Sequence, residues 1–241
     1  MSLLRVGPAH ADRLHFGPWR GEVSTAYLAP ARPALGPLAA GDVRRGIEAA
    51  AAAGYGAAIT AALPPADQRP FLEAGFALAQ CLHLLVHPLD HLPDVPPAAP
   101  LRRARRRDHA AALAVDHAAF DGFWRMDEPG LLDALAATTA VRFRVAGGRR
   151  GVVGYAVTGR SDGRGYVQRL AVDPAREGEG IGASLLVDGL RWLRRRGARD
   201  AVVNTQEGNE RSLRLYQRTG FVVQPEGLAV LKLDLRAGSV P

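Results

Sequence analysis

The chain has 241 residues, of which 47% are hydrophobic and 23% are charged, and this ordinary globular balance excludes a disordered or fibrous protein. The length allows one large domain or two modest ones, and the single cysteine, Cys81, excludes an intramolecular disulfide framework and a cysteine-based zinc cluster. The net charge of +7 comes almost entirely from arginine, because Lys232 is the only lysine.

The N-terminal sequence carries no basic region followed by an apolar run and a cleavage site, so we expect a cytoplasmic protein. The most apolar tract, residues 49–63, is mostly alanine and is interrupted by Gly54 and Gly56. A membrane span needs about 20 strongly apolar residues. We therefore expect no membrane partner.

The first 92 residues contain a helical stretch that ends at Gly54, an apolar strand, a second helix, and the pair Gly75-Phe76. Residues 82–89 then have the pattern of a strand. Five histidines occur here, namely His10, His15, His83, His87 and His91. His83 and His87 would share a face on a helix, but the strand that runs into Pro88 argues against a metal site, and none is predicted.

Four prolines lie between Pro93 and Pro100, where they remove backbone donors and hold the chain extended. Such a segment suits a linker. We therefore expect an N-terminal domain over residues 1–92, a linker over 93–100, and a C-terminal domain over 101–241.

Five arginines crowd into residues 102–107, directly before Asp108. The run fits a solvated strand and turn that lead into a helix capped by Asp108, and it also fits a contact with a polyanion. No aromatic residues interleave with the arginines, as a nucleic-acid surface would require. We therefore expect no nucleic-acid partner.

Helices and strands alternate through residues 101–241, which predicts an α/β domain with a mixed sheet. The expected elements are helices over 108–120 and 129–137, strands over 141–146, 152–158 and 165–172, a helix from Ile181 to Arg196, a strand over 201–205, a helix over 209–219, and a closing hairpin over 221–235.

A glycine-rich turn, residues 177–182, joins the strand 165–172 to the next helix. Its alternating glycines bring successive N–H groups close to a ligand, and the helix start adds unpaired donors and a positive dipole end, so the turn suits a phosphate or pyrophosphate. It is neither a dinucleotide fingerprint nor a P-loop, because G-x-G-x-x-G and Gly-Lys-Ser/Thr are absent. Taken alone, it also fits an ordinary strand-to-helix turn.

A second group of residues lies downstream. Asn209 is a natural helix N-cap, and Tyr216 follows seven positions later, two turns along on the same face. With the glycine turn before it, this segment resembles the GCN5-related N-acetyltransferase (GNAT) superfamily. The resemblance covers about residues 100–235 and is strongest over 168–182 and 209–221.

The resemblance implies the GNAT acyl-CoA N-acyltransferase fold and an enzyme that moves the acetyl group of acetyl-CoA to a primary amine, on a small molecule or a protein N-terminus. It implies that the Val172 amide polarises the thioester carbonyl, that Asn209 contacts the pantetheine arm, and that Tyr216 protonates the departing thiolate. Tyr216 also fits a core aromatic beside Leu213. The implied acetyl-CoA-binding residues are Leu170, Ala171, Val172, Glu177, Gly178, Glu179, Gly180, Ile181, Gly182, Ala183, Asn209 and Tyr216.

Two departures from the family pattern stand out. Glu177 replaces the usual Gln or Arg, and together with Glu179 it opposes anion binding, although Arg176 offsets part of that charge. Asn204 stands where a glutamate commonly acts as general base, and an amide cannot accept a proton usefully. The remaining candidates for a base are Glu207, Asp116, His117 and Asp121.

Acceptor choice in this family usually depends on the loop between the first two helices, here residues 120–127. Its aromatic and acidic side chains fit either an apolar groove with a cation-attracting rim or core packing under a loop. The candidate substrate residues are Asp116, Phe120, Asp121, Phe123, Trp124 and Asn204.

A faint internal repeat relates the two parts of the chain. Phe71, Gly75 and Phe76 precede Tyr216, Gly220 and Phe221 by the same offset of 145 residues. The N-terminal copy has phenylalanine in place of Tyr216 and no clustered glycines, so we expect a degenerate GNAT-like half without chemistry. A catalytically weak CoA-binding sensor or interaction protein is the alternative function, and a homodimer is left open.

Overall fold

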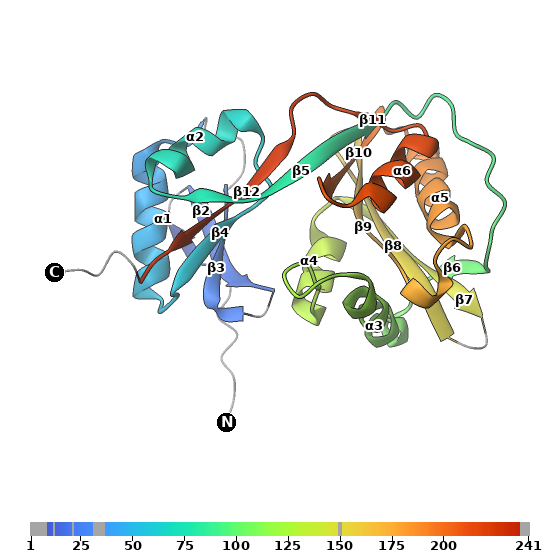
Figure 1. Ribbon diagram of the computed structural model, residues 1–241, viewed down its shortest axis with the longest axis horizontal. Helices are drawn as coiled ribbons and strands as arrows, with labels where there is room; N and C mark the ends of the chain where they lie inside the picture. Colours follow the sequence, from blue (N-terminus) through green and yellow to red (C-terminus); the bar gives the residue numbers. More distant parts are fainter. Residues whose placement is uncertain (1–8, 12, 21, 31–36, 149–150, 237–241) are drawn as a thin grey trace. The chain divides into compact units, whose positions relative to one another are not determined.

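The computed structural model describes residues 9–11, 13–20, 22–30, 37–148 and 151–236 (Figure 1). The chain forms two compact units. Unit 1 comprises residues 1–83 and 225–241, and unit 2 comprises residues 84–224. Each unit combines helices with parallel and antiparallel strand pairs, which confirms the predicted mixed α/β class.

Unit 1 places its strands in the order β1-β2-β3-β4-β12-β5. Strands β3 and β4 are parallel, and β12 is antiparallel to both of its neighbours. A core that includes Leu14, Leu28, Val43 and Phe71 holds the sheet and helices together. The elements are β1 (Ala9–Ala11), β2 (Leu14–Trp19), β3 (Glu22–Pro30), α1 (Ala40–Ala52), β4 (Ala57–Thr60), α2 (Pro65–Glu73), the first part of β5 (Ala77–His87), and β12 (Leu228–Asp234).

Unit 2 orders its strands β5-β10-β9-β8-β7-β6, with β11 also on β5. Strands β6 to β9 are antiparallel, and β9 and β10 are parallel. The elements are β6 (Leu101–Arg103), a 3₁₀ turn (Arg106–Asp108), α3 (His109–Ala119), α4 (Glu128–Ala136), β7 (Ala140–Gly148), β8 (Gly151–Ser161), β9 (Arg164–Val172), a 3₁₀ turn (Pro174–Arg176), α5 (Ile181–Arg195), β10 (Asp200–Gln206), α6 (Glu210–Arg218), and β11 (Val222–Val223).

The sheet of unit 2 has helices on both faces (Figure 1). Successive residues of a strand point to opposite faces. Val145 and Tyr155 accordingly pack with α3 and α4, whereas their neighbours Ala146 and Ala156 pack with α5. These predicted helices and strands are confirmed, with ends that differ by at most three residues.

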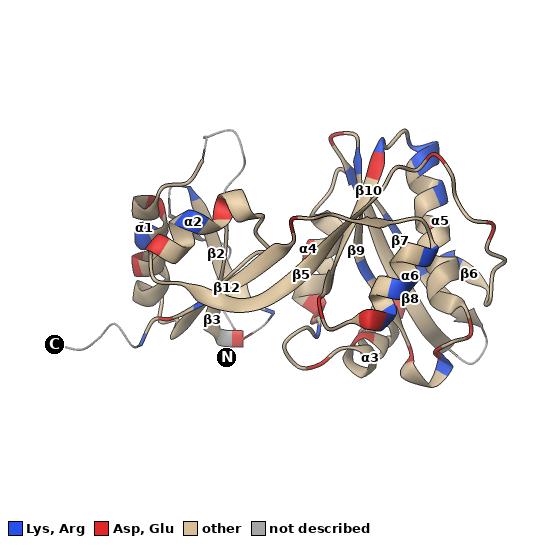
Figure 2. Ribbon diagram, turned by 45° about the horizontal axis from the view of Figure 1, so that its top comes forward, with Lys and Arg blue, Asp and Glu red and all other residues tan. Residues whose placement is uncertain are grey.

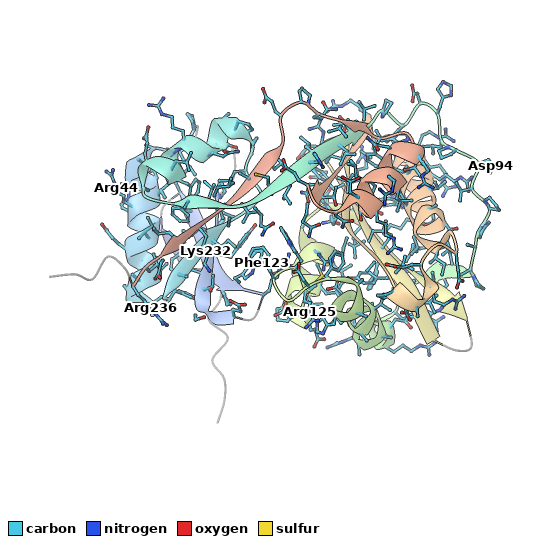
Figure 3. All side chains as sticks on the ribbon, in the orientation of Figure 1. Arg44, Asp94, Phe123, Arg125, Lys232 and Arg236 are labelled. Atoms are coloured by element: carbon cyan, nitrogen blue, oxygen red, sulfur yellow. The ribbon has the colours of Figure 1, made fainter. Side chains whose placement is uncertain are left out.

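The proline-rich segment 93–100 is not a linker between the compact units, because it lies inside unit 2. The Ala98 amide donates to Oγ of Ser184 in α5, and that hydroxyl lies 3.2 Å from the Pro96 carbonyl. Asp94 projects from the same extended stretch (Figure 3) and pairs with Arg191 of α5. A proline-rich extended segment packs on a helix as readily as it spans two domains, so the sequence could not separate these outcomes.

The C-terminal tail does not form the predicted closing hairpin. Strand β11 pairs with Leu85 and Val86, whereas β12 pairs with residues 77–82, so the two lie along successive stretches of β5 instead of beside each other. Because β12 pairs within unit 1 and residues 84–92 belong to unit 2, the compact units also depart from the expected boundaries at residues 92 and 101. The long, eleven-residue β5 makes this arrangement possible.

The internal repeat appears in the local structure of both units. After α2, the amide of Phe76 donates to the Phe71 carbonyl, and after α6 the amide of Phe221 donates to the Tyr216 carbonyl. The intervening glycines, Gly75 and Gly220, have φ of +95° and +97°. These bonds and a left-handed glycine define a Schellman helix end, so the three repeated positions encode the same turn twice.

Candidate active site

Strands β9 and β10 pair over only a short stretch. Their last pair joins Tyr166 and Val202, after which residues 167–172 and 203–206 continue without pairing to each other. Strand β9 remains paired with β8 as far as Val172. We call these two diverging strand ends the β9–β10 fork. Ligands of α/β sheets bind at the carboxyl ends of parallel strands, so the fork is the first candidate for a site.

The backbone of β9 presents donors to this fork. The Asp173 amide donates to the Val153 carbonyl of β8 at 2.9 Å. N–H groups alternate in direction along a strand, so the amides of Val172 and Leu170 are directed away from β8 and toward the fork. A β-bulge at Gln168, between the β8 partners Val157 and Thr158, adds local twist to β9 just before these donors.

The turn that follows β9 presents six consecutive amides, those of residues 178–183, that have no acceptor among the described residues. Gly178 and Gly180 adopt φ of +80° and +78°, which L side chains rarely tolerate. Gly180 is the N-cap of α5, and the turn is exposed up to it. Unpaired amides at a helix N-terminus form an anion-binding concavity, so the residues fit a diphosphate.

The two acids of this turn are paired with arginines. Arg176 donates two hydrogen bonds of 2.6 Å to Glu179, and this contact lowers the pKa of the Glu179 carboxyl. Glu177 forms an ion pair with Arg211 of α6. The positive charges of Arg176 and Arg211 therefore neutralise Glu179 and Glu177, so these acids no longer oppose anion binding as the sequence suggested. Arg211 was not predicted from the sequence, since no spacing rule links it to Glu177.

Tyr216 lies at the base of the fork. Its ring belongs to the same buried cluster as Val167 and Val203, the first residues beyond the last β9–β10 pair. The side chain is 6% exposed, and its hydroxyl makes no hydrogen bond to any described residue. Burial raises the pKa of Tyr216 to about 12, against an opposing effect of the positive charge of Arg169. The phenol is therefore a protonated donor at neutral pH.

Two asparagines lie along β10 and α6. Asn209 is the N-cap of α6, as predicted, because its Oδ1 accepts from the Ser212 amide at 3.0 Å and its Nδ2 lies 3.4 Å from Oε1 of Gln206. Asn204 is exposed in the part of β10 that does not pair with β9. Both residues thus belong to the elements that border the fork, and their contact with a ligand stays a prediction.

Asp116 is the centre of a buried network. It is 0% exposed and accepts four hydrogen bonds: one from the Met126 amide, one from the Tyr155 hydroxyl, and two from the Arg169 guanidinium, all between 2.6 and 2.8 Å. Burial, followed by the charge of Asp116, raises the pKa of Tyr155, which keeps this phenol a donor. Each oxygen of this carboxylate already accepts two hydrogen bonds, so none is free for a substrate. Asp116 is therefore a structural residue and not the general base or substrate residue that the sequence suggested.

The loop between α3 and α4 is fastened to β9 by Arg169. The guanidinium donates to the Trp124 carbonyl at 2.7 Å and stacks 3.6 Å from the centre of the Phe120 ring. Phe123 packs edge-to-face on Trp124, and Figure 3 shows Phe123 and Arg125 on this loop. Phe120, Phe123 and Trp124 are all half-buried, and Phe120 packs against the core cluster of α3, α4, β7 and β8. The role of the loop in acceptor choice stays a prediction.

The other candidates for a general base are near the surface. His117 lies 2.9 Å from the Met126 carbonyl through Nε2. Asp121 is exposed and accepts from the Trp124 amide at 3.2 Å, and Glu207 is exposed. No group of three or more His, Cys, Asp or Glu side chains that could hold a metal occurs in the described ranges.

The comparisons with known proteins point to one family. The profile of the acetyltransferase (GNAT) family matches residues 109–221. Residues 109–221 form a GNAT domain. This domain contains the fork, the glycine turn, Tyr216 and the Asp116 network, and it ends at Phe221, after the Schellman turn.

Curated relatives with sequences similar to this chain are named mycothiol acetyltransferase. The one from Thermobispora bispora is 31% identical over 169 residues, which cover 62% of this chain and 57% of that protein. The one from Acidimicrobium ferrooxidans is 39% identical over 71 residues, which cover 30% of this chain and 23% of that protein. The alignments thus span less than two thirds of these relatives.

Solved structures share the fold beyond the GNAT domain. A GCN5-related N-acetyltransferase from Sphaerobacter thermophilus covers 93% of this chain and 77% of its own, with a TM-score of 0.60 at 17% identity. A tandem GNAT protein from the clavulanic acid biosynthesis pathway, solved without acetyl-CoA, covers 92% of this chain and 78% of its own, with a TM-score of 0.64 at 12% identity. The tandem GNAT-like architecture predicted from the sequence is confirmed at the level of fold.

Unit 1 closes the position that corresponds to the fork of the GNAT domain. Its parallel pair β3–β4 runs on to Leu28 and Thr60, and the Ala61 amide then donates to the Leu28 carbonyl. At the start of α1 the carboxylate of Asp42, 7% exposed, accepts from the Ala39 amide and from the side chains of Arg13 and Arg45. An internal anion thus occupies the helix start that the GNAT domain leaves open.

None of the helices in the described part of the chain is both long and apolar enough to cross a membrane.

Proposed function

We propose that this chain is an acetyl-CoA-dependent N-acetyltransferase whose acceptor is the primary amine of a small molecule. The observation that carries the proposal is the β9–β10 fork, which joins a turn of six unpaired amides to a buried, protonated Tyr216. The names of the curated relatives support acetyl transfer to a small molecule of the kind that mycothiol acetyltransferases use.

Acetyl-CoA supplies the acetyl group as an activated thioester. The amides of residues 178–183 would hold its diphosphate, with the charges of Glu177 and Glu179 already neutralised by Arg211 and Arg176. The edge of β9 that faces β10 beyond Tyr166 would align the pantetheine arm through main-chain groups, as a further strand does in a sheet. Asn209, as a capped helix start beside β10, would border that arm.

The Val172 amide would serve as the oxyanion donor. It is directed toward the fork, and a fixed backbone donor stabilises charge that develops on a carbonyl oxygen without reorganising. The Tyr216 hydroxyl would hold the proton that the departing sulfur requires. A phenol with its pKa raised to about 12 keeps its proton at neutral pH, so the hydroxyl is available as a hydrogen-bond donor and proton source where negative charge develops on the departing sulfur.

A screen for thiol release tests the proposal. Acetyl-CoA is mixed with the chain and with amino acids, polyamines, aminoglycosides, N-terminal peptides and the acceptor of the mycothiol acetyltransferases, and free CoA is followed with a thiol reagent. We expect turnover with a small-molecule amine. If calorimetry shows that acetyl-CoA binds but no amine causes release of free CoA, the chain is a CoA-binding sensor and not an enzyme.

The glycine turn gives a prediction with a matched control. Gly178→Ala forces a side chain into a left-handed φ, so we expect a loss of about 1 kcal/mol in unfolding free energy and about a tenfold rise in the Kd of acetyl-CoA, because the amides of the turn are displaced and no longer donate to the diphosphate. Gly197→Ala is the control, since Gly197 at the far end of α5 has φ of +70° and equal space. It should lose the same stability and keep the Kd; a similar rise in both variants would show that strain, not the turn, controls binding.

A further inference from the structure

A cluster of arginines lies between β7 and α5, apart from the fork. Asp188 of α5 binds two of them: Nε and a terminal nitrogen of Arg142 lie 2.8 and 2.9 Å from its oxygens, and Nε of Arg144 lies 3.3 Å away. Trp192 and Arg196 follow Asp188 at intervals of four residues, on the same face of α5. The Arg196 guanidinium lies 5.9 Å from the centre of the Trp192 ring.

These side chains surround a hollow of about 260 Å³, which we call the arginine hollow. Its lining consists of Arg103, residues 141–144, Trp192 and Arg196. A second hollow of about 630 Å³, lined by residues 102–107, shares Arg103 with it. Figure 2 shows Lys and Arg residues on β7 and along α5.

The arginine hollow carries an excess of positive charge. Four arginines face one carboxylate, that of Asp188, so the balance is +3. In the part of the chain that the structure describes, Arg103 and Arg196 have no acid partner. Nε of Arg144 is buried beside Asp188 and is not open to a ligand. The guanidinium groups of Arg103 and Arg196 therefore supply the donors as well as the charge.

The chemistry of guanidinium selects the class of ligand. Its planar fork matches the paired oxygens of phosphate and carboxylate groups. The volume suits a small molecule that carries such groups. Trp192 is 8% exposed, so it offers no open ring on which a nucleic-acid base could stack. Small, multiply charged anions thus fit the hollow better than a polynucleotide does.

The arginine hollow is separate from the glycine turn. The turn precedes the first residue of α5, and Arg196 follows the last. At about 1.5 Å per residue, Trp192 and Arg196 lie about 16 and 22 Å along the helix axis from its first residue, Ile181. We propose that the arginine hollow binds a small multivalent oxyanion bearing phosphate or carboxylate groups. This inference does not depend on the proposed acetyl transfer.

Calorimetric titration of the full chain at low ionic strength tests the proposal. Pyrophosphate in one arm and citrate in the other distinguish a phosphate from a carboxylate ligand. We expect saturable binding of at least one probe and a Kd about tenfold higher in Arg103→Gln/Arg196→Gln. Both arginines are exposed and without an acid partner in the described residues, so this variant should fold.

The control variant is Arg44→Gln/Arg218→Gln, which removes the same charge from two other exposed positions (Arg44 is labelled in Figure 3). It should bind the probe as the parent chain does. An equal rise of the Kd in both variants would show that the net charge of the chain, and not the arginine hollow, controls binding. Binding that is unchanged in Arg103→Gln/Arg196→Gln would place the anion elsewhere, for example on the glycine turn. Either result, or no saturable binding of either probe, overturns the proposal.

Discussion

Replacing Tyr216 by phenylalanine is expected to lower kcat by about 10²–10⁴-fold, the usual contribution of a positioned general acid. The Kd of acetyl-CoA should stay close to that of the parent chain, because the diphosphate is held by backbone amides in a different segment. The fold should persist, since the ring keeps its packing with Phe221, at 5.6 Å between centroids, and the hydroxyl makes no hydrogen bond to a described residue. Steady-state kinetics together with calorimetry measure both quantities.

Tyr166→Phe is the matched control for this prediction. It removes the same hydroxyl from β9, at the last pair with β10 and thus at the closed end of the fork. Its kcat should remain that of the parent chain. Equal kcat values in the two variants would remove Tyr216 from the chemistry and leave it as a core aromatic, the other role its position on α6 allows.

The raised pKa of Tyr216 sets the pH dependence. The phenol keeps its proton at every pH below about 12, so it should cause no loss of kcat up to about pH 10, where an ordinary tyrosine begins to ionise. Because the folded pKa exceeds the unfolded value of 10.0, its contribution to stability is present below pH 10 and is lost as the pH rises through about 12. A pH–kcat profile of the parent chain tests this, and a fall near neutral pH would assign the titration to another group.

The parts of the site that follow from local backbone rules could be predicted from the sequence. The stripe of leucines and the closing Gly197 define α5, and Asn209 caps α6 where its residue type indicates. Glycines that adopt positive φ marked the phosphate turn, and a residue offset of 145 marked the duplicated helix end. Each of these features depends on neighbours within about six residues, so a single sequence carries it.

The features that depend on distant partners could not be predicted in this way. The tail has the pattern of a hairpin, but its two strands pair with separate stretches of β5, which lies about 140 residues earlier in the chain. The sequence offered Asp116 as a free acid, because its hydrogen-bond donors Arg169, Tyr155 and Met126 lie 10 to 53 residues away and meet it only in the fold. Arg211 reaches Glu177 only because α6 lies next to the turn.

The buried network gives the largest expected effect on stability. Asp116→Ala leaves the guanidinium of Arg169, 9% exposed, without its carboxylate and the Tyr155 hydroxyl without its acceptor. Breaking a buried ion pair from one side costs about 3–5 kcal/mol. At about 2–4 °C per kcal/mol for a protein of this size, the Tm should fall by about 10 °C. Urea unfolding and a thermal scan measure both changes.

The exposed pair Arg69–Glu73 on α2 is the control, because its side chains are 84% and 47% exposed and meet at 2.7 Å on the surface of the helix. Glu73→Gln should change the unfolding free energy by less than about 1 kcal/mol. The double variant Asp116→Leu/Arg169→Met should be more stable than Asp116→Ala, since it removes both buried charges together. If the double variant were the less stable of the two, the loss would come from cavity or packing changes around Tyr155 and not from an uncompensated Arg169.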